Sequence, residues 1–146
     1  ALTGGGTSGD VTLNVDVANL AGTALTANGV ALDVDLAAVH TADFITDATT
    51  ARTLTSTDAG KTILFTSASA TVVTVDASTD FPVGTRVDIV ANGAGALTVT
   101  ASTATVTGAA TSTTSGSFTI GAQYSAATLL CVATDTYLLI GNVAVV

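Results

Sequence analysis

Aspartates at alternate positions are the residues of this sequence whose spacing best suits metal binding. Asp33 and Asp35 are one residue apart, and Asp16 lies at the position equivalent to Asp35 in a repeated segment. Alternate residues of a strand point to the same side, and calcium is held by several oxygen ligands. A polar strand face in water uses the same residues, however, and the chain has no Asp-x-Asp-x-Asp-Gly loop. We therefore expect no metal and no other cofactor.

The one histidine and the one cysteine are the residues that could take part in catalysis. A Ser-His-Asp site needs a serine on a strained turn, and the chain contains no Gly-x-Ser-x-Gly motif. His40 better suits a hinge or a hydrogen bond between an N-terminal segment and the rest. Cys131 lies in the apolar run Thr128–Ala133, with no neighbouring cation in sequence to lower its pKa, which favours a buried structural thiol. We expect no catalytic residue and no enzymatic activity.

Binding of phosphate or nucleic acid has little support. Gly4–Gly6 and Gly93–Gly95 are typical of turns, since neither is followed by the lysine of a phosphate-binding loop. Each basic residue can pair with a nearby acid, as Arg86 with Asp88 on one strand face. Three bases cannot form a basic stripe, and the net charge of −8 repels phosphate. The basic residues are Arg52, Lys61 and Arg86.

Two tyrosines are the candidates for sugar binding. Tyr124 and Tyr137 are large amphipathic rings in a chain without tryptophan, and such rings either stack on a sugar or lie at the edge of a core. The run Thr111–Gly116 is typical of a flexible, exposed loop that could take part in such a site.

The composition favours strands over helices. Thr, Ala and Val supply 30, 27 and 18 of the 146 residues, and all 11 acidic residues are Asp. Surface helices need Glu, Lys, Gln and Arg, whereas Thr and Val suit a half-buried pleated surface. The mean hydropathy of +0.65 is high. No segment approaches the roughly 20 mostly apolar residues of a membrane span, so we expect no membrane insertion.

The charges are distributed unevenly. No charged residue occurs in the 46 residues between Asp88 and Asp135. Depletion of charge is typical of the cores of protein interfaces, so this gap predicts an obligate homo-oligomer. The chain starts at Ala1, as after removal of an initiator or within a longer polypeptide, and no basic segment precedes an apolar one, so we expect no signal peptide.

The first 40 residues are predicted to form an extended β arm. Apolar residues alternate with polar ones in Val11–Val17 and again in Val30–Leu36, and Asn28-Gly29 predicts a tight turn. The segment Leu13–Leu20 aligns with Leu32–Val39 at an offset of 19 residues, so the arm holds two repeats. Two such short units cannot bury their apolar faces alone, which predicts packing against the second domain or pairing with other copies, as in a trimeric shaft.

Residues 41–146 are predicted to form an antiparallel β-sandwich or a jelly-roll-like domain. Short strands recur every 8–12 residues, as these folds require. Turn residues separate the strands at Thr57–Gly60 and Asp80–Gly84, and hairpins are expected at Asn92–Gly95 and Ala133–Thr136. The expected strands are Arg52–Thr55, Lys61–Thr66, Ala70–Asp76, Thr85–Ala91, Ala96–Ala101, Ala104–Thr107, Ser117–Ile120, Ala127–Ala133 and Thr136–Asn142.

Both parts of the chain resemble proteins of tailed-bacteriophage appendages. Leu2–Val15, followed by Gly22–Asp33, resembles a repeat in the shafts of tail-fibre proteins. The runs Arg52–Lys61 and Phe81–Arg86, and the ending with Ala127–Leu130 and Thr136–Asn142, resemble a β domain of tail fibres and other virion appendages. The resemblance covers most of the chain and implies a homotrimeric virion structural protein without catalytic residues. The chain lacks a long shaft and an evident tip domain, which favours a head-fibre or capsid-decoration protein.

The function expected from these patterns is assembly on the surface of a virion. The partners would be two further copies of the chain and a capsid or tail protein, with the arm docking by strand addition. An alternative is an adhesion module of a tail fibre that binds a host receptor or glycan through Thr111–Gly116 and an exposed tyrosine. A second alternative, a depolymerase, would require a pair of carboxylates in a cleft.

Overall fold

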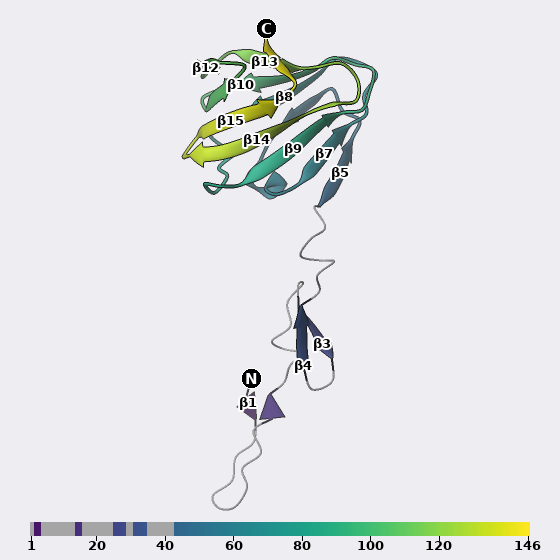
Figure 1. Cartoon of the computed structure of the whole chain (residues 1–146), viewed down its shortest axis with the longest axis vertical. Coiled ribbons are helices and arrows are strands. Elements are labelled where there is room, and N and C mark those ends of the chain that lie inside the picture. Colours follow the sequence, from purple (N-terminus) through teal and green to yellow (C-terminus); the bar gives the residue numbers. More distant parts are fainter. Residues whose placement is uncertain (1, 4–13, 16–24, 29–30, 35–42) are drawn as a thin grey trace, which may run out of the picture. The chain divides into compact units, whose positions relative to one another are not determined.

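The computed structural model describes residues 2–3, 14–15, 25–28, 31–34 and 43–146, with side chains for the last of these ranges (Figure 1). It divides into two units, residues 1–42 and residues 43–146. In the first unit, β1 (Leu2–Thr3) pairs antiparallel with β2 (Asn14–Val15), and β3 (Leu25–Asn28) pairs antiparallel with β4 (Ala31–Val34). Asn28 is the last residue of β3 and faces Ala31, while Gly29 of the tight turn expected at Asn28-Gly29 lies outside the described residues. The remainder of the two expected arm strands lies outside the described residues.

The second unit, which we call the β domain (residues 43–146), consists of two sheets packed face to face (Figure 1). The seven-stranded sheet has the order β12-β11-β15-β14-β9-β7-β5, and the five-stranded sheet has the order β16-β13-β10-β8-β6. The strands of the seven-stranded sheet are β5 (Phe44–Asp47), β7 (Thr62–Phe65), β9 (Arg86–Ala91), β11 (Thr105–Gly108), β12 (Thr111–Thr113), β14 (Ser125–Ala133) and β15 (Thr136–Gly141). Those of the five-stranded sheet are β6 (Ala51–Thr53), β8 (Thr71–Val75), β10 (Leu97–Ala101), β13 (Ser117–Ile120) and β16 (Val143–Val145).

Both sheets are mixed, so the prediction of an antiparallel domain is wrong in its strand directions, although the domain is all-β as expected. From β5 to β11 every strand lies in the sheet opposite to that of the strand before it. The chain therefore returns to each sheet in the same direction, and β5, β7 and β9 are parallel neighbours, as are β6, β8 and β10. Antiparallel pairs begin with the later strands, as in the hairpin of β14 and β15, which lies between β9 and β11.

The connection Asn92–Gly95 illustrates the reason for this difference. It was expected to close a hairpin, but β9 and β10 belong to different sheets, so the turn carries the chain across the sandwich. Alternation of apolar and polar residues marks a strand with one buried face and does not distinguish a neighbour in the same sheet from one in the opposite sheet. The expected hairpin at Ala133–Thr136, by contrast, is confirmed.

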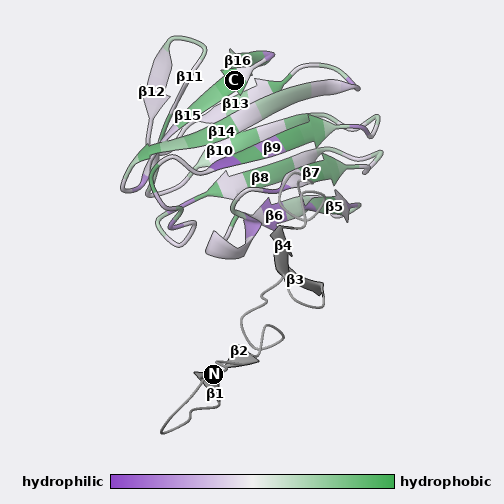
Figure 2. Ribbon diagram, turned by 60° about the horizontal axis from the view of Figure 1, so that its bottom comes forward, coloured by the Kyte–Doolittle hydropathy of each residue, from purple (hydrophilic) through white to green (hydrophobic). Residues whose placement is uncertain are grey.

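Strand alternation builds the core between the sheets. In Figure 2 the strands carry alternating hydrophobic and less hydrophobic bands, and every second residue is buried in β7, β8, β9, β10 and β13. Phe81, in the connection after β8, packs edge-on against Tyr137 of β15 with ring centroids 6.0 Å apart. The largest fully buried side chains are Tyr137, Phe118, Leu54, Ile63, Ile89, Leu97, Leu129, Val73, Val75, Val87, Val99 and Val106.

Nine expected strands agree with observed ones to within two residues at each end, and three observed strands of the β domain were not expected. These are β5, β12 and β16, each of three or four residues. The run Thr111–Gly116 was expected to be a flexible loop, but its first half is β12, which pairs antiparallel with β11. Its residues suit a loop by propensity, and pairing with a neighbouring strand overrides that preference.

In the part of the chain described here, no helix combines the length and the hydrophobicity that a membrane span requires.

Two glycines hold the connections at one end of the sandwich close together. A Cβ on Gly93 would collide with the backbone carbonyl of Ser67, and a Cβ on Gly95 would collide with that of Ser69. The backbone of the connection after β9 thus packs directly on the backbone of the connection after β7. These positions accept no side chain unless the backbone moves.

We predict that Gly95→Ala lowers the free energy of unfolding by about 2 kcal/mol, because the added methyl group overpacks this contact. Ala94→Ser is the matched control, since Ala94 lies between the two glycines and is exposed. It should change the free energy of unfolding by less than about 0.5 kcal/mol. Urea titration of the three proteins measures both values. Equal stability of Gly95→Ala and the parent would contradict the close packing.

Candidate functional site

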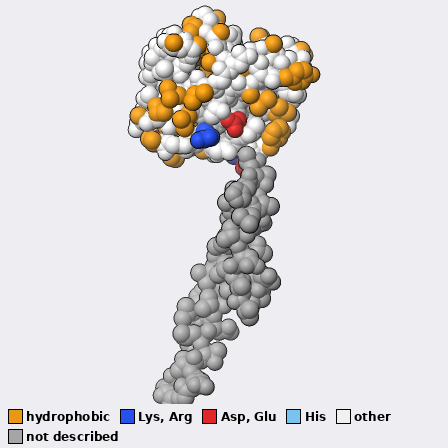
Figure 3. Space-filling view, in the orientation of Figure 1, with side chains coloured by type: hydrophobic (Ala, Val, Ile, Leu, Met, Phe, Trp, Pro, Cys, Tyr) orange, Lys and Arg blue, Asp and Glu red, His pale blue; other side chains and the backbone are white. Residues whose placement is uncertain are grey.

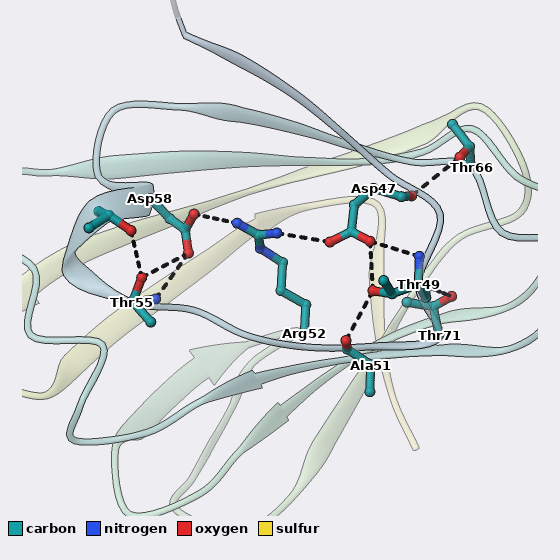
Figure 4. A network of polar contacts seen from close by, with 9 residues as sticks. Asp47, Thr49, Ala51, Arg52, Thr55, Asp58, Thr66 and Thr71 are labelled. Atoms are coloured by element: carbon teal, nitrogen blue, oxygen red, sulfur yellow. Dashed lines mark hydrogen bonds and ion pairs between the residues drawn. The ribbon is translucent and has the colours of Figure 1, made fainter.

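A buried ionic network joins the open edges of the two sheets (Figure 4). Arg52 lies on β6, the edge strand of the five-stranded sheet, and Asp47 lies on β5, the edge strand of the seven-stranded sheet. Their Nη1 and Oδ2 atoms are 2.9 Å apart. The Nη2 atom of Arg52 is 2.5 Å from Oδ1 of Asp58 in the 3-10 turn Ser56–Asp58. One guanidinium therefore bridges two carboxylates that are almost fully buried.

Further hydrogen bonds fix both carboxylates. Thr49 donates its backbone N–H and its hydroxyl to Oδ1 of Asp47, at 2.8 and 2.6 Å, and the N–H of Thr55 donates to Oδ2 of Asp58 at 3.0 Å. Burial raises the pKa of Asp47, but the hydrogen bonds from Thr49 and the charge and hydrogen bond of Arg52 outweigh it, so the pKa lies below its ordinary 3.8. With its carboxylates occupied in this way, the network acts as a clamp between the sheets.

The outer face of the seven-stranded sheet is the most unusual surface of the β domain. Alternation directs large apolar side chains outward along five neighbouring strands, with Phe44 61%, Ile140 55% and Val132 39% exposed. Figure 3, which shows this face, has hydrophobic groups on both sides of a basic and an acidic group. We call this surface the apolar face; its apolar residues are Phe44, Leu64, Val90, Ala126, Leu130, Val132, Leu138 and Ile140.

A hollow lies in the apolar face next to Arg86, the basic residue of that face. Arg86, Thr128, Leu130 and Ile140 line this hollow, which has a volume of about 240 Å³. Strand register places Arg86 beside Leu130 and places Asp88 beside Thr128. Among the outward positions of the described strands in this sheet, Arg86 and Asp88 alone carry charge.

Arg86 and Asp88 do not form the ion pair expected from their spacing. No acidic side chain of the described residues lies within ion-pair distance of Arg86. Asp88 accepts a hydrogen bond from the hydroxyl of Thr128 at Oδ1, 2.6 Å away, and its Oδ2 receives no hydrogen bond from the β domain. The two other bases do pair with acids, Arg52 in the clamp and Lys61 with Asp43 at 3.5 Å.

The outer face of the five-stranded sheet has a different character. Register aligns Thr53, Thr74, Thr100 and Ser117 in one row across four strands. The hydroxyls of Thr100 and Ser117 lie 2.9 Å apart within this row. The neighbouring row contains Ala51, Val72, Thr98, Thr119 and Ala144. Small side chains and hydroxyls suit contact with water, so the sandwich has one polar outer face and one apolar outer face.

The two tyrosines considered for a sugar platform lie in different environments. Tyr137 is fully buried in the core, in line with the alternative of a core residue, and takes no part in such a platform. Tyr124 is 77% exposed in the connection before β14 and has a φ of +70°, a left-handed conformation that few residues other than glycine adopt. Its backbone N–H donates to the carbonyl of Ala91 at 2.5 Å, and the amide of Gln123 donates to the carbonyl of Asn92 at 2.8 Å. An exposed aromatic ring is thus held on a fixed backbone.

The thiol of Cys131 is buried, as the sequence predicted. It donates a hydrogen bond to the carbonyl of Phe81 at 3.2 Å. Burial raises the pKa of this thiol, which keeps it protonated and unreactive at neutral pH.

Several expected site residues cannot be placed. Asp16, Asp35, His40 and Gly4–Gly6 lie outside the described residues, and for Asp33 in β4 only the backbone is described. Within the described residues, no group of three or more His, Cys, Asp or Glu side chains is arranged to hold a metal ion. The expectation that the aspartates of the arm hold no metal therefore stays a prediction.

Searches with this chain find no match among protein-family models, curated proteins or solved structures.

We predict that Arg52→Met lowers the free energy of unfolding by about 3 kcal/mol, because it leaves two buried carboxylates without a counter-charge. Lys61→Met is the matched control. It breaks an ion pair with Asp43, whose side chain is 80% exposed, and should cost no more than about 1 kcal/mol. Chemical denaturation of both variants tests the difference. Equal losses would show that the clamp stabilises no more than a surface ion pair.

The same variant should shift the acid sensitivity of the fold. Because the folded-state pKa of Asp47 is below 3.8, its contribution to stability is present above that pH and is lost as pH falls through the lowered pKa. In Arg52→Met the burial of Asp47 remains and the lowering by Arg52 is gone, so its pKa rises. By linkage, this rise reduces the contribution that acid can remove. Across a pH series, the free energy of unfolding should therefore fall less with decreasing pH in the variant than in the parent.

Proposed function

We propose that this chain is a structural protein of a bacteriophage virion that acts by assembly. In this proposal it forms a homotrimer, as a fibre or capsid-decoration component on the particle surface, with a capsid or tail protein as its partner. The chain itself performs no reaction. The observation that carries the proposal is the apolar face, an outer sheet surface with large exposed hydrophobic side chains beside an opposite face of threonines and small residues.

Exposed apolar patches of this kind mark sites of protein association. The other face of the same sandwich gives an internal comparison, because its strands have the same alternation and place mainly Thr, Ser and Ala outward. The exposed apolar side chains are therefore a property of the seven-stranded sheet and do not reflect a general excess of apolar residues in the chain. The 46-residue stretch without charge contains the last three residues of β9 and all of β14, and it supports the same conclusion.

The virion identity is supported by the resemblance of Leu2–Val15 and Gly22–Asp33 to fibre-shaft repeats. The hairpin of β3 and β4 falls within and just after the second of these segments. In the proposal, the N-terminal unit pairs with other copies or adds strands to a protein of the particle.

We predict that the native mass in solution is three times the chain mass of 14.1 kDa, because three copies cover their apolar faces together. Light scattering coupled to size exclusion measures this mass directly. A monomer at every concentration tested would contradict the proposed assembly.

A second candidate function is adhesion to a host glycan, and Tyr124 is the specific observation that favours it. The ring is 77% exposed, and its backbone is held in a left-handed conformation. Backbone strain of this kind is concentrated at functional sites. An exposed aromatic ring on a fixed backbone suits stacking on a sugar.

If the chain binds a glycan in this way, Tyr124→Ala should weaken binding to an array of bacterial surface polysaccharides at least tenfold. Tyr124→Phe, which keeps the ring, should retain binding. The native mass of both variants should equal that of the parent, so that loss of binding is not loss of assembly. No binding by the parent, or equal binding by Tyr124→Ala, would remove this candidate.

A further inference from the structure

We infer that the apolar face is the surface on which copies of this chain associate, with Arg86 of one copy paired to Asp88 of the next. This inference rests on the proposed self-assembly and names the surface and the contact that would carry it. The occupant of the face is therefore a second copy of the same chain.

The charges of the apolar face are complementary to those of another copy. Arg86 and Asp88 lie two residues apart on one strand, have opposite signs and point outward from the same face. The guanidinium of Arg86 has no ion-pair partner among the described residues, and Oδ2 of Asp88 receives no hydrogen bond there. When three such faces meet around a three-fold axis, the arginine of each copy can reach the aspartate of the next.

The surroundings of these two charges make pairing between copies important. Arg86 lies beside Leu130, which in turn lies beside Leu138, so a copy seated here removes the guanidinium from water. A charge buried without a partner costs several kcal/mol, whereas a paired one with good geometry does not. An interface on this face therefore requires a carboxylate opposite Arg86, and a second copy supplies one at Asp88.

The size and shape of the face also suit a second copy. Six steps of about 4.8 Å between seven strands make the sheet about 29 Å wide, and its longer strands extend about 20 Å or more. With the relief of its side chains, such a face approaches the order of 800 Å² that each partner buries in a standard interface. The hollow of about 240 Å³ beside Arg86 leaves room for an apolar side chain of the other copy.

The outer face of the five-stranded sheet is less suited to association than the apolar face. Its rows of Thr, Ser, Ala and Val contain no charged residue at their outward strand positions among the described residues, so no ion pair can fix the register of two copies there. The apolar face combines hydrophobic area with one pair of opposite charges. Such a pair determines which orientation of the copies is stable.

The test is a charge swap followed by native mass measurement. Arg86→Asp and Asp88→Arg should each weaken association at least about thirtyfold and give a mass below that of the parent, because each places like charges opposite one another. The double variant with both substitutions restores opposite charges between copies, and it should regain the mass of the parent. Circular dichroism and thermal unfolding show whether each variant is folded.

A second pair of variants tests the face without changing Arg86 or Asp88. Leu130→Asp introduces a charge on the apolar face and should give monomers. Thr98→Asp introduces the same charge on the outer face of the five-stranded sheet and should keep the parent mass.

The outcomes separate the inference from the proposed function. A parent protein that forms trimers, with Arg86→Asp and Leu130→Asp also trimeric, overturns the assignment of this face and leaves the proposed assembly in place. Loss of assembly in Thr98→Asp, with Leu130→Asp unaffected, assigns the interface to the other face and overturns the inference. A monomeric parent overturns both.

Discussion

The crossing of the chain from one sheet to the other at successive connections is the constraint on which the rest of this structure depends. Because β5 to β11 alternate between the sheets, each crossing brings the chain back to the same sheet in the same direction. Such crossings require connections that fit against one another at the ends of the sandwich. Gly93 and Gly95 satisfy this requirement, since the backbone there leaves no space for a side chain. The same crossings leave β5 and β6 as edge strands of the two sheets, and contacts between these edges must close that side of the sandwich.

The few charges of the β domain take different roles because of this arrangement. Arg52 closes the open side between the two edge strands and holds two buried carboxylates. Lys61 forms a peripheral pair with an exposed aspartate. Arg86, on a central strand, faces outward among apolar side chains without such a partner in the described residues. In a chain with three basic residues, a cation in this position is an important clue to an interface.

The two proposed roles use different parts of the β domain. The apolar residues of the apolar face lie on β5, β7, β9, β14 and β15, whereas Tyr124 lies in the connection that leads into β14. Assembly through the face and recognition through the connection would therefore be separable by substitution. In many β proteins a rigid sandwich serves as the scaffold, and the connections between its strands recognise other molecules.

Much of the fold could be predicted from the sequence because period-two alternation reflects a local property, one buried and one exposed side of each strand. Nine strands of the β domain, the buried Cys131 and the final hairpin follow from that pattern and from turn residues. The three short strands β5, β12 and β16 were missed, since three or four residues are too few to show a clear alternation.

The direction of the strands, the burial of Tyr137 and the partners of Arg52 could be decided only by the tertiary structure. Each depends on which strands become neighbours after the chain has crossed between sheets, and residues far apart in sequence set that arrangement. Arg86 and Asp88 show this limit of sequence-based prediction. Their spacing predicts an ion pair with each other, but in the fold both side chains point outward and do not form it. The sequence by itself determined an all-β, charge-poor chain with alternating faces. The tertiary structure decided which of those faces was left exposed, because only the packing of the two sheets determines which side of each strand is covered.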